Sequence, residues 1–219
     1  MILSGIFVLL GILAGNGAVY VFNRIPVSWL CDYGQEPDAA LRAGDRQRIN
    51  SHPWKALFSA LFVMAGIKLG VEDPFYAAPA LAAMWTLLEI AVADCKYMII
   101  PDQFVILLAV TSFGFVPYYP SLADPVLGAL LGGGCMLLVS AAGKLIFRRE
   151  ALGFGDVKLF AAAGLLLGLY GTAVTLILAS FLSCIFYGGR LLGRKIKRGD
   201  MQPLAPFIAA AAAFYLVFS

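Results

Sequence analysis

Apolar residues occur along this chain in long runs that are separated by short polar segments. A run of about 20 apolar residues is long enough to cross the hydrocarbon core of a bilayer as a helix. We therefore predict an all-α fold, a polytopic bundle of about eight transmembrane helices that forms a single membrane-embedded domain over residues 1–219. The expected spans are 2–22, 54–70, 75–93, 103–118 and 125–147, two within 157–189, and 203–218.

The run 157–189 is too long for one span, and we expect it to break at Gly168-Leu169-Tyr170-Gly171. Composition agrees with a membrane protein. The chain is 61% hydrophobic and 13% charged, with a mean hydropathy of +0.87, whereas soluble domains carry roughly 25% charged residues. These values exclude an ordinary soluble domain, and no sequence feature indicates a nucleic-acid partner.

Basic residues predict the orientation of the bundle. All of the 16 lysines and arginines except Lys68 lie in or beside alternate loops, whereas the opposite loops carry Glu72, Asp73 and Asp124. Cytoplasmic loops of membrane proteins are enriched in Lys and Arg. We therefore expect the four basic loops to face the cytoplasm and both termini to face outward.

Two aspartates stand at the ends of apolar runs. Asp94 ends one run, and Asp156 begins another within Gly153-Phe154-Gly155-Asp156. An ionisable side chain at a membrane span is costly and marks a functional site by default. Two carboxylates that meet and share a proton can act as the acid and base of peptide hydrolysis. Both aspartates fall on the predicted cytoplasmic side.

Other polar and small residues near these aspartates are candidates for shaping the site. The two glycines permit close backbone approach or a positive φ beside an extended substrate. Asp102, in Pro101-Asp102, fits a helix start, which we favour over catalysis. Glu89 could tune the site, contact substrate or be paired within the bundle, and for Lys158 we favour snorkelling toward the surface over catalysis.

Histidine and cysteine usage indicates that the chain has no metal centre. His52 is the only histidine, so a His-based triad or a multi-His metal site is excluded. The four cysteines contain no C-x-x-C pair, which disfavours a zinc site. We expect the four thiols to be reduced.

Two motifs carry a family resemblance. Residues 94–102, from Asp94 to Pro101-Asp102, and residues 150–158, which contain the Gly-Phe-Gly-Asp run, resemble the type IV prepilin peptidases, bacterial members of the G-x-G-D intramembrane aspartyl proteases. Residues 15–26 and 203–207 are weaker matches, the second with Leu and Ala in place of Phe and Gly. The family's eight spans equal the number predicted above.

The resemblance implies an aspartic endopeptidase of the bacterial inner membrane that cleaves the short basic leader of prepilin-like proteins at the cytoplasmic face. Asp94 and Asp156 are the expected catalytic pair, with no cofactor for the peptidase reaction. The expected partners are prepilin-like precursors and the lipid bilayer. The residues expected to bind substrate or shape the site are Gly153, Gly155, Glu150, Asp102, Glu89 and Lys158.

The polar segment 24–53 departs from the family pattern. Many members have a longer cytoplasmic insertion there, with two C-x-x-C pairs associated with N-methylation of the product, whereas this segment contains only Cys31. We therefore do not expect methylation, and S-adenosylmethionine would be needed only if that activity were retained. The alternative functions are an ion- or proton-coupled transporter or channel that uses the same carboxylates, or a scaffold that only binds pilin precursors.

Overall fold

The structure is a computed structural model that describes residues 2–31, 48–147, 152–196 and 201–219. These residues form helices and no β-strand, which confirms the all-α prediction. The helices in chain order are α1 (Ile2–Phe22), the 3-10 helix η1 (Val27–Leu30), α3 (Trp54–Glu72), α4 (Pro74–Tyr97), α5 (Asp102–Thr111), the 3-10 helix η2 (Ser112–Tyr118), α6 (Asp124–Phe147), α7 (Phe154–Leu192) and α8 (Ala205–Phe218).

Five of these helices, α1, α3, α4, α6 and α7, are long and apolar enough to cross a membrane among the residues that the structure describes. The predicted spans 103–118 and 203–218 are shorter as α-helices than expected. In the first, α5 ends at Thr111 and the chain continues as the 3-10 helix that contains Pro117. In the second, α8 has only 14 residues because the helix begins at Ala205, with Pro206 in its first turn.

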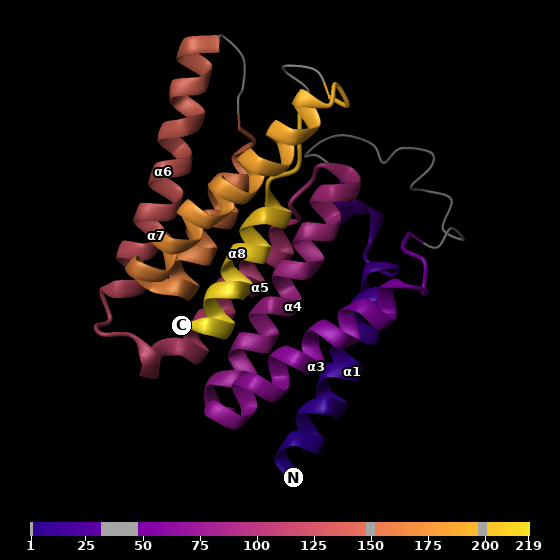
Figure 1. Cartoon of the computed structure of the whole chain (residues 1–219). Helices are drawn as coiled ribbons and strands as arrows, with labels where there is room; N and C mark the ends of the chain where they lie inside the picture. Colours follow the sequence, from indigo (N-terminus) through magenta and orange to yellow (C-terminus); the bar gives the residue numbers. More distant parts are fainter. Residues whose placement is uncertain (1, 32–47, 148–151, 197–200) are drawn as a thin grey trace.

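Helix α7 is two helices joined by a sharp bend at Gly168. This glycine has φ 67° and ψ −176°, a conformation that only glycine adopts readily. Asp156 and Tyr187 each interact electrostatically with Asp94, although they lie 31 positions apart in α7. A straight helix would separate them by about 46 Å, so the chain must reverse between them. The predicted break of this run is confirmed, and Figure 1 shows the two halves running down and back up.

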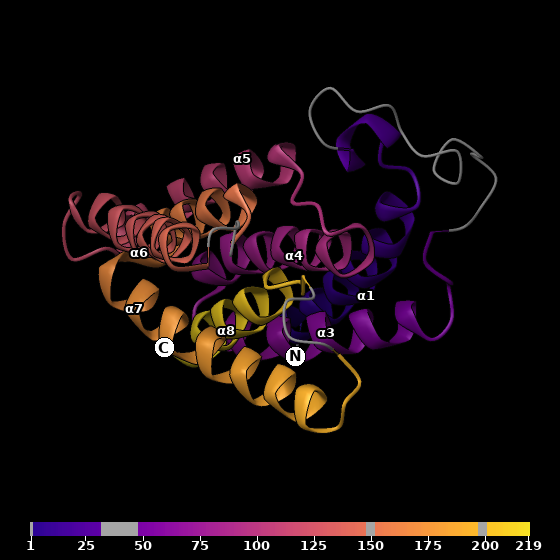
Figure 2. The ribbon, with the colours of Figure 1, turned by 90° about the horizontal axis from the view of Figure 1, so that it is seen from above.

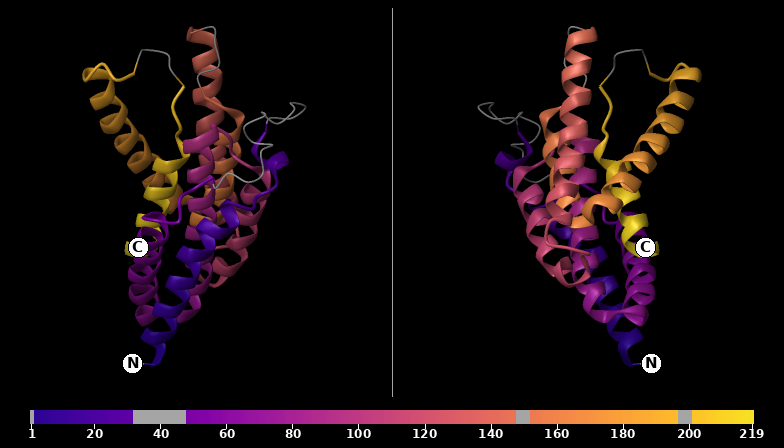
Figure 3. Two further views of the ribbon diagram at one scale, coloured as in Figure 1. Left: turned by 90° about the vertical axis from the view of Figure 1, so that its right-hand side faces the viewer. Right: turned by 90° about the vertical axis from the view of Figure 1, so that its left-hand side faces the viewer.

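Close backbone contacts hold the first half of α7 against α6. A Cβ on Gly128 would collide with the carbonyl oxygen of Gly164, and a Cβ on Gly164 would collide with that of Gly128. Small residues allow membrane helices to approach this closely. Seen from above, α4 and α8 lie centrally, with α1 and α3 on one side and α6 on the other (Figure 2). The second half of α7 leans away from α6 in the side views (Figure 3).

Candidate active site

Asp94 lies in the last turn of α4 and is buried, with 6% of its surface exposed. Its carboxylate meets the beginning of α8, where the backbone N–H of Ala205 donates to Oδ2 over 2.8 Å. The backbone of Leu204 provides a second interaction of the same kind. The first N–H groups of a helix have no partner within the helix and carry partial positive charge. The α8 N-terminus therefore fixes the Asp94 side chain inside the bundle.

Asp156 lies in the first turn of α7, which begins after Gly153. The backbone N–H of Asp156 donates to the Gly153 carbonyl over 3.1 Å. Its Oδ1 is buried and has no hydrogen-bond partner among the described residues. A buried carboxylate oxygen without a partner is costly, so this atom is available to a water molecule or a substrate.

The two aspartates, 62 positions apart in the sequence, lie near one another at one end of the bundle, within range of each other's charge. The Asp94 charge acts directly on Asp156, so the two carboxyl groups are close enough to influence one another's protonation. Asp94 is held by the N-terminus of α8, and Asp156 lies in the first turn of its own helix. Such a pair can hold one proton between two carboxyl groups and exchange it with a bound substrate.

The glycines beside Asp156 differ in their surroundings. Gly153 has φ −69° and ψ 146°, so the suggested positive φ is wrong at this position. A Cβ there would lie 3.7 Å from Oδ2 of Asp156, an ordinary contact. A Cβ on Gly155 would lie 3.2 Å from Cβ of Ile100, in the segment between α4 and α5. Close approach is therefore a property of Gly155, where α7 packs against that segment.

Asp102 and Lys158 form an ion pair that joins the first turns of α5 and α7. The predicted helix start at Asp102 is confirmed, because α5 begins at this residue after Pro101. The ammonium group of Lys158 bonds to the Asp102 carboxylate and lies 5.5 Å from the ring centre of Phe154, and the favoured snorkelling of this side chain stays a prediction. The pair connects the two segments that flank Asp156.

Glu89 is buried in α4, with 1% of its surface exposed. Neither of its carboxylate oxygens has a hydrogen-bond partner among the described residues. Among the described residues, no partner supports the suggested paired structural role. Five positions separate Glu89 from Asp94, which places the two about 140° apart around the helix, on different faces. Glu150 lies outside the described residues.

Tyr187, in the second half of α7, is a contributor that the sequence did not reveal. Its hydroxyl donates to the Pro203 carbonyl over 2.5 Å, and its ring packs edge-on against Phe207, with ring centres 5.2 Å apart. These contacts fix the segment before α8, the helix whose first residue donates to Asp94. The run Pro203-Leu204-Ala205-Pro206 predicts the start of a helix. It does not predict which residues this helix start contacts.

The described residues contain no group of three or more His, Cys, Asp or Glu side chains that could hold a metal ion. Among the described residues, the site contains two carboxyl groups, two helix N-termini and a nearby tyrosine. Two neighbouring carboxyl groups can carry out acid–base chemistry.

Comparison with known proteins identifies the family. The profile of the type IV leader peptidase family matches residues 81–188, a segment that contains both Asp94 and Asp156. Residues 81–188 therefore belong to this family. No solved structure matches the chain.

Three curated relatives illustrate the match, and each is named prepilin leader peptidase/N-methyltransferase. The protein of Aeromonas salmonicida (strain A449) is 32% identical over 141 residues, which is 64% of this chain and 48% of the relative. That of Aeromonas hydrophila is 28% identical over 93% of this chain and 69% of the relative. That of Bacillus subtilis (strain 168) is 28% identical over 70% and 60%, respectively. The chain spans about half the length of the first of these relatives.

Proposed function

We propose that this protein is a membrane-embedded aspartic endopeptidase that removes the short basic leader of prepilin-like precursors at the cytoplasmic membrane face. The observation that carries the proposal is the electrostatic proximity of Asp94 and Asp156 at one end of the bundle. The family match and the names of the relatives support the class of substrate. The orientation follows from the basic residues, and the bacterial inner membrane is the corresponding location.

The proposed reaction uses the two aspartates as one acid–base unit. One carboxylate takes a proton from water, whose oxygen attacks the scissile carbonyl carbon. The other carboxyl group donates a proton to the carbonyl oxygen, and the resulting tetrahedral intermediate collapses as a proton passes to the leaving amine. Because the pair titrates as a unit, the acid and base roles belong to the pair rather than to either residue.

The position of the carboxylates supports hydrolysis over ion transport. Asp94 lies three residues before the end of α4, and Asp156 is the third residue of α7. Carboxylates in transporters lie mostly near the middle of the membrane, at a repeat interface. Helix ends are instead the places where both water and an extended polypeptide can reach the side chains.

Acidic residues near the site are proposed to receive the basic leader. Asp102 begins α5 on the same end of the bundle and is paired with Lys158. Glu150 precedes the Gly-Phe-Gly-Asp run by two residues in the sequence. Opposite charges favour association of a basic leader with this end before the scissile bond is placed. N-methylation is not included in the proposed function.

The test is to incubate the purified protein, in lipid nanodiscs, with a precursor that carries a basic leader and a hydrophobic helix. Mass spectrometry of the product should show cleavage between the leader and the helix. Release of the same fragment by an Asp94→Asn preparation would reveal a contaminating protease. A proton or cation flux across proteoliposomes without any cleavage would favour the transporter, and precursor binding without cleavage would favour the scaffold.

A further inference from the structure

A cavity of about 490 Å3 opens at the end of the bundle opposite the aspartates. Its wall includes Tyr76 near the start of α4, whereas Asp94 lies 18 residues further along that helix. At 1.5 Å per residue, the two are about 27 Å apart. The cavity is therefore separate from the candidate active site, and its volume lies within the range of small-ligand pockets.

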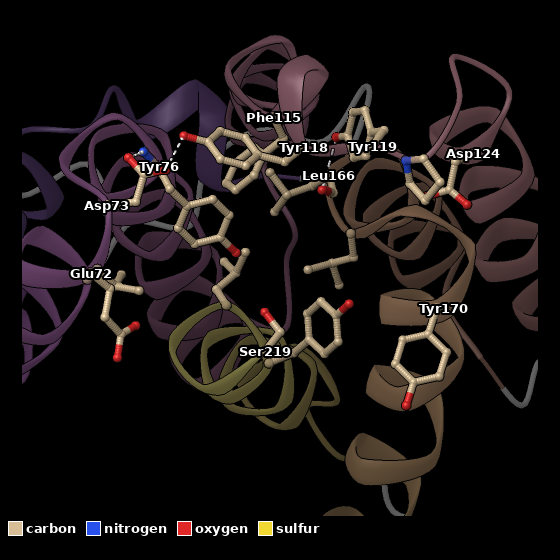
Figure 4. Close-up of a pocket in the computed structure, with 15 residues that line it drawn as sticks. Glu72, Asp73, Tyr76, Phe115, Tyr118, Tyr119, Asp124, Leu166, Tyr170 and Ser219 are labelled. Atoms are coloured by element: carbon tan, nitrogen blue, oxygen red, sulfur yellow. Dashed lines mark hydrogen bonds between the residues drawn. The ribbon is translucent and has the colours of Figure 1, made fainter.

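Aromatic side chains from several elements form much of the cavity wall. Tyr76 lies edge-on to Phe115 and Tyr118, with ring centres 5.2 Å and 5.0 Å away, and Tyr170 lies 6.4 Å from Tyr215. Figure 4 shows Tyr76, Tyr118 and Phe115 on one side of the open space and Tyr170 on the other. The faces of aromatic rings carry partial negative charge and attract organic cations.

The charged residues of the wall are acidic. Glu72, Asp73 and Asp124 line the cavity, and none of the described lining residues is lysine, arginine or histidine. Lys68 balances Glu72 across 2.9 Å. The Asp73 carboxylate accepts hydrogen bonds from the Tyr118 hydroxyl and from the first N–H groups of α4. Two of the three acids therefore already have partners.

Asp124 differs from these two acids. Within the described part of the chain its carboxylate has no ion pair and no side-chain hydrogen bond. Its charge acts on the hydroxyls of Tyr119 and Tyr215, which line the same space. Its Oδ2 also lies against Gly168, at the bend of α7. One carboxylate that has no ion pair among the described residues thus lies beside a group of tyrosine rings.

We propose that this cavity binds an alkylammonium group through the tyrosine rings and the Asp124 carboxylate. An organic cation fits better than a metal ion, because the described residues offer no cluster of three metal-ligating side chains. Aromatic walls favour a cation whose charge is spread over carbon-bearing groups. Two sources present this chemistry, the headgroup of an ethanolamine or choline lipid and a free amine such as choline.

The test uses the full-length protein in two arms. In the first, choline chloride is titrated into protein in a non-ionic detergent, with sodium chloride as the ionic-strength control, and binding is measured by calorimetry and by the shift in Tm. In the second, native mass spectrometry compares retention of phosphatidylethanolamine and phosphatidylglycerol. Saturable binding in the first arm identifies a free amine, and selective retention of phosphatidylethanolamine identifies the lipid. Either result supports the proposal.

Matched variants test whether the residues that line the cavity are responsible for binding. Asp124→Asn should weaken binding about tenfold, because it removes a charged partner, whereas Glu72→Gln should change it little because Lys68 already balances that charge. Tyr170→Leu should weaken binding about 2- to 30-fold through loss of a cation–π contact. Phe113→Leu, which changes an exposed aromatic residue outside the wall, is its control.

Folding is controlled for by two substitutions at different places in the wall. Tyr170 is 74% exposed, so its substitution should leave the bundle intact even if Asp124→Asn does not. Absence of choline binding together with equal retention of the two lipids would overturn the proposal, and so would equal effects of Tyr170→Leu and Phe113→Leu.

Discussion

The backbone N–H of Ala205 donates to the Asp94 carboxylate across 111 positions of sequence. The bond joins the last turn of α4 to the first residue of α8 in the buried part of the bundle. Because α8 begins inside the bundle, the first backbone N–H group of this helix contacts the Asp94 side chain directly. The same carboxyl group is the one that acts on Asp156.

The first prediction concerns the two aspartates. Asp94→Asn and Asp156→Asn should each reduce precursor cleavage by at least about a hundredfold, because an amide cannot exchange the proton that the reaction needs. Initial rates with a fluorescent precursor give the measurement. Asp102→Asn is the matched control and should lose much less activity. Wild-type turnover by either of the first two variants, with an unchanged Tm, would exclude the aspartyl mechanism.

Tyr187 provides the second prediction. Tyr187→Phe removes the hydroxyl that holds Pro203 and keeps the ring packed on Phe207. We expect a loss of about three- to tenfold in kcat with little change in KM, together with a shifted pH–rate profile, because the donors to Asp94 are no longer fixed.

The control for Tyr187 is Tyr20→Phe, at an exposed tyrosine of α1. That variant should keep both the rate and the pH profile. A Tyr187→Phe enzyme that loses stability while its pH profile is unchanged would assign this tyrosine a purely structural role.

The third prediction compares the glycines beside Asp156. Gly155→Ala should reduce cleavage more than Gly153→Ala, because its new methyl group would lie 3.2 Å from Cβ of Ile100, whereas that of Gly153 meets Oδ2 of Asp156 at 3.7 Å. Steady-state rates of the two variants give the comparison. Equal activity of both alanine variants and the wild type would leave the glycines as ordinary residues of a helix start.

The ion pair of Asp102 and Lys158 gives the fourth prediction. Both side chains are about one-third exposed, so their direct coupling should be only about 0.5–1 kcal/mol. A double-mutant cycle with Asp102→Asn and Lys158→Met measures it through Tm and through kcat/KM. The double variant should be less impaired than the two single effects combined. Strict additivity would show that the two residues act independently.

Methylation is the subject of the fifth prediction. Residues 24–53 contain one cysteine, which cannot supply the four thiolates of a structural zinc site. The purified protein should contain no stoichiometric zinc by elemental analysis, and chelators should leave cleavage unchanged. With S-adenosylmethionine present, the product should keep a free N-terminal amine. A product heavier by one methyl group would show that the chain has the second activity named for its relatives.

Much of the site could be predicted from local sequence because its residues break a strong pattern. Asp94 and Asp156 are conspicuous in a chain with few charges, and Gly168 marks a bend in a run too long for one span. The contact with Ala205 could not be predicted, since no local pattern relates residues 111 positions apart. The bond of Tyr187 to Pro203 was missed for a similar reason, because both lie in segments without a polar signal.

The lengths of the shorter helices were harder to predict than their existence. Hydropathy stays high from Asp102 to Tyr118, but it does not report where α-helix gives way to 3-10 helix at Ser112. The pairing of Lys158 with Asp102 was also missed, because the two residues lie 56 positions apart in the sequence. The acid of α5 that lies beside it becomes visible only in three dimensions.

The bend at Gly168 also has a consequence for biogenesis. The first half of α7, residues 154–167, is about 21 Å long, less than the roughly 30 Å of a hydrocarbon core. No charged residue lies between Lys158 and Arg190, so the turn presents no charged loop for the insertion machinery to translocate. The two halves of α7 should therefore enter the bilayer together as a helical hairpin. Asp156, the third residue of α7, should reach its position in the site only when the second half has folded back against the first.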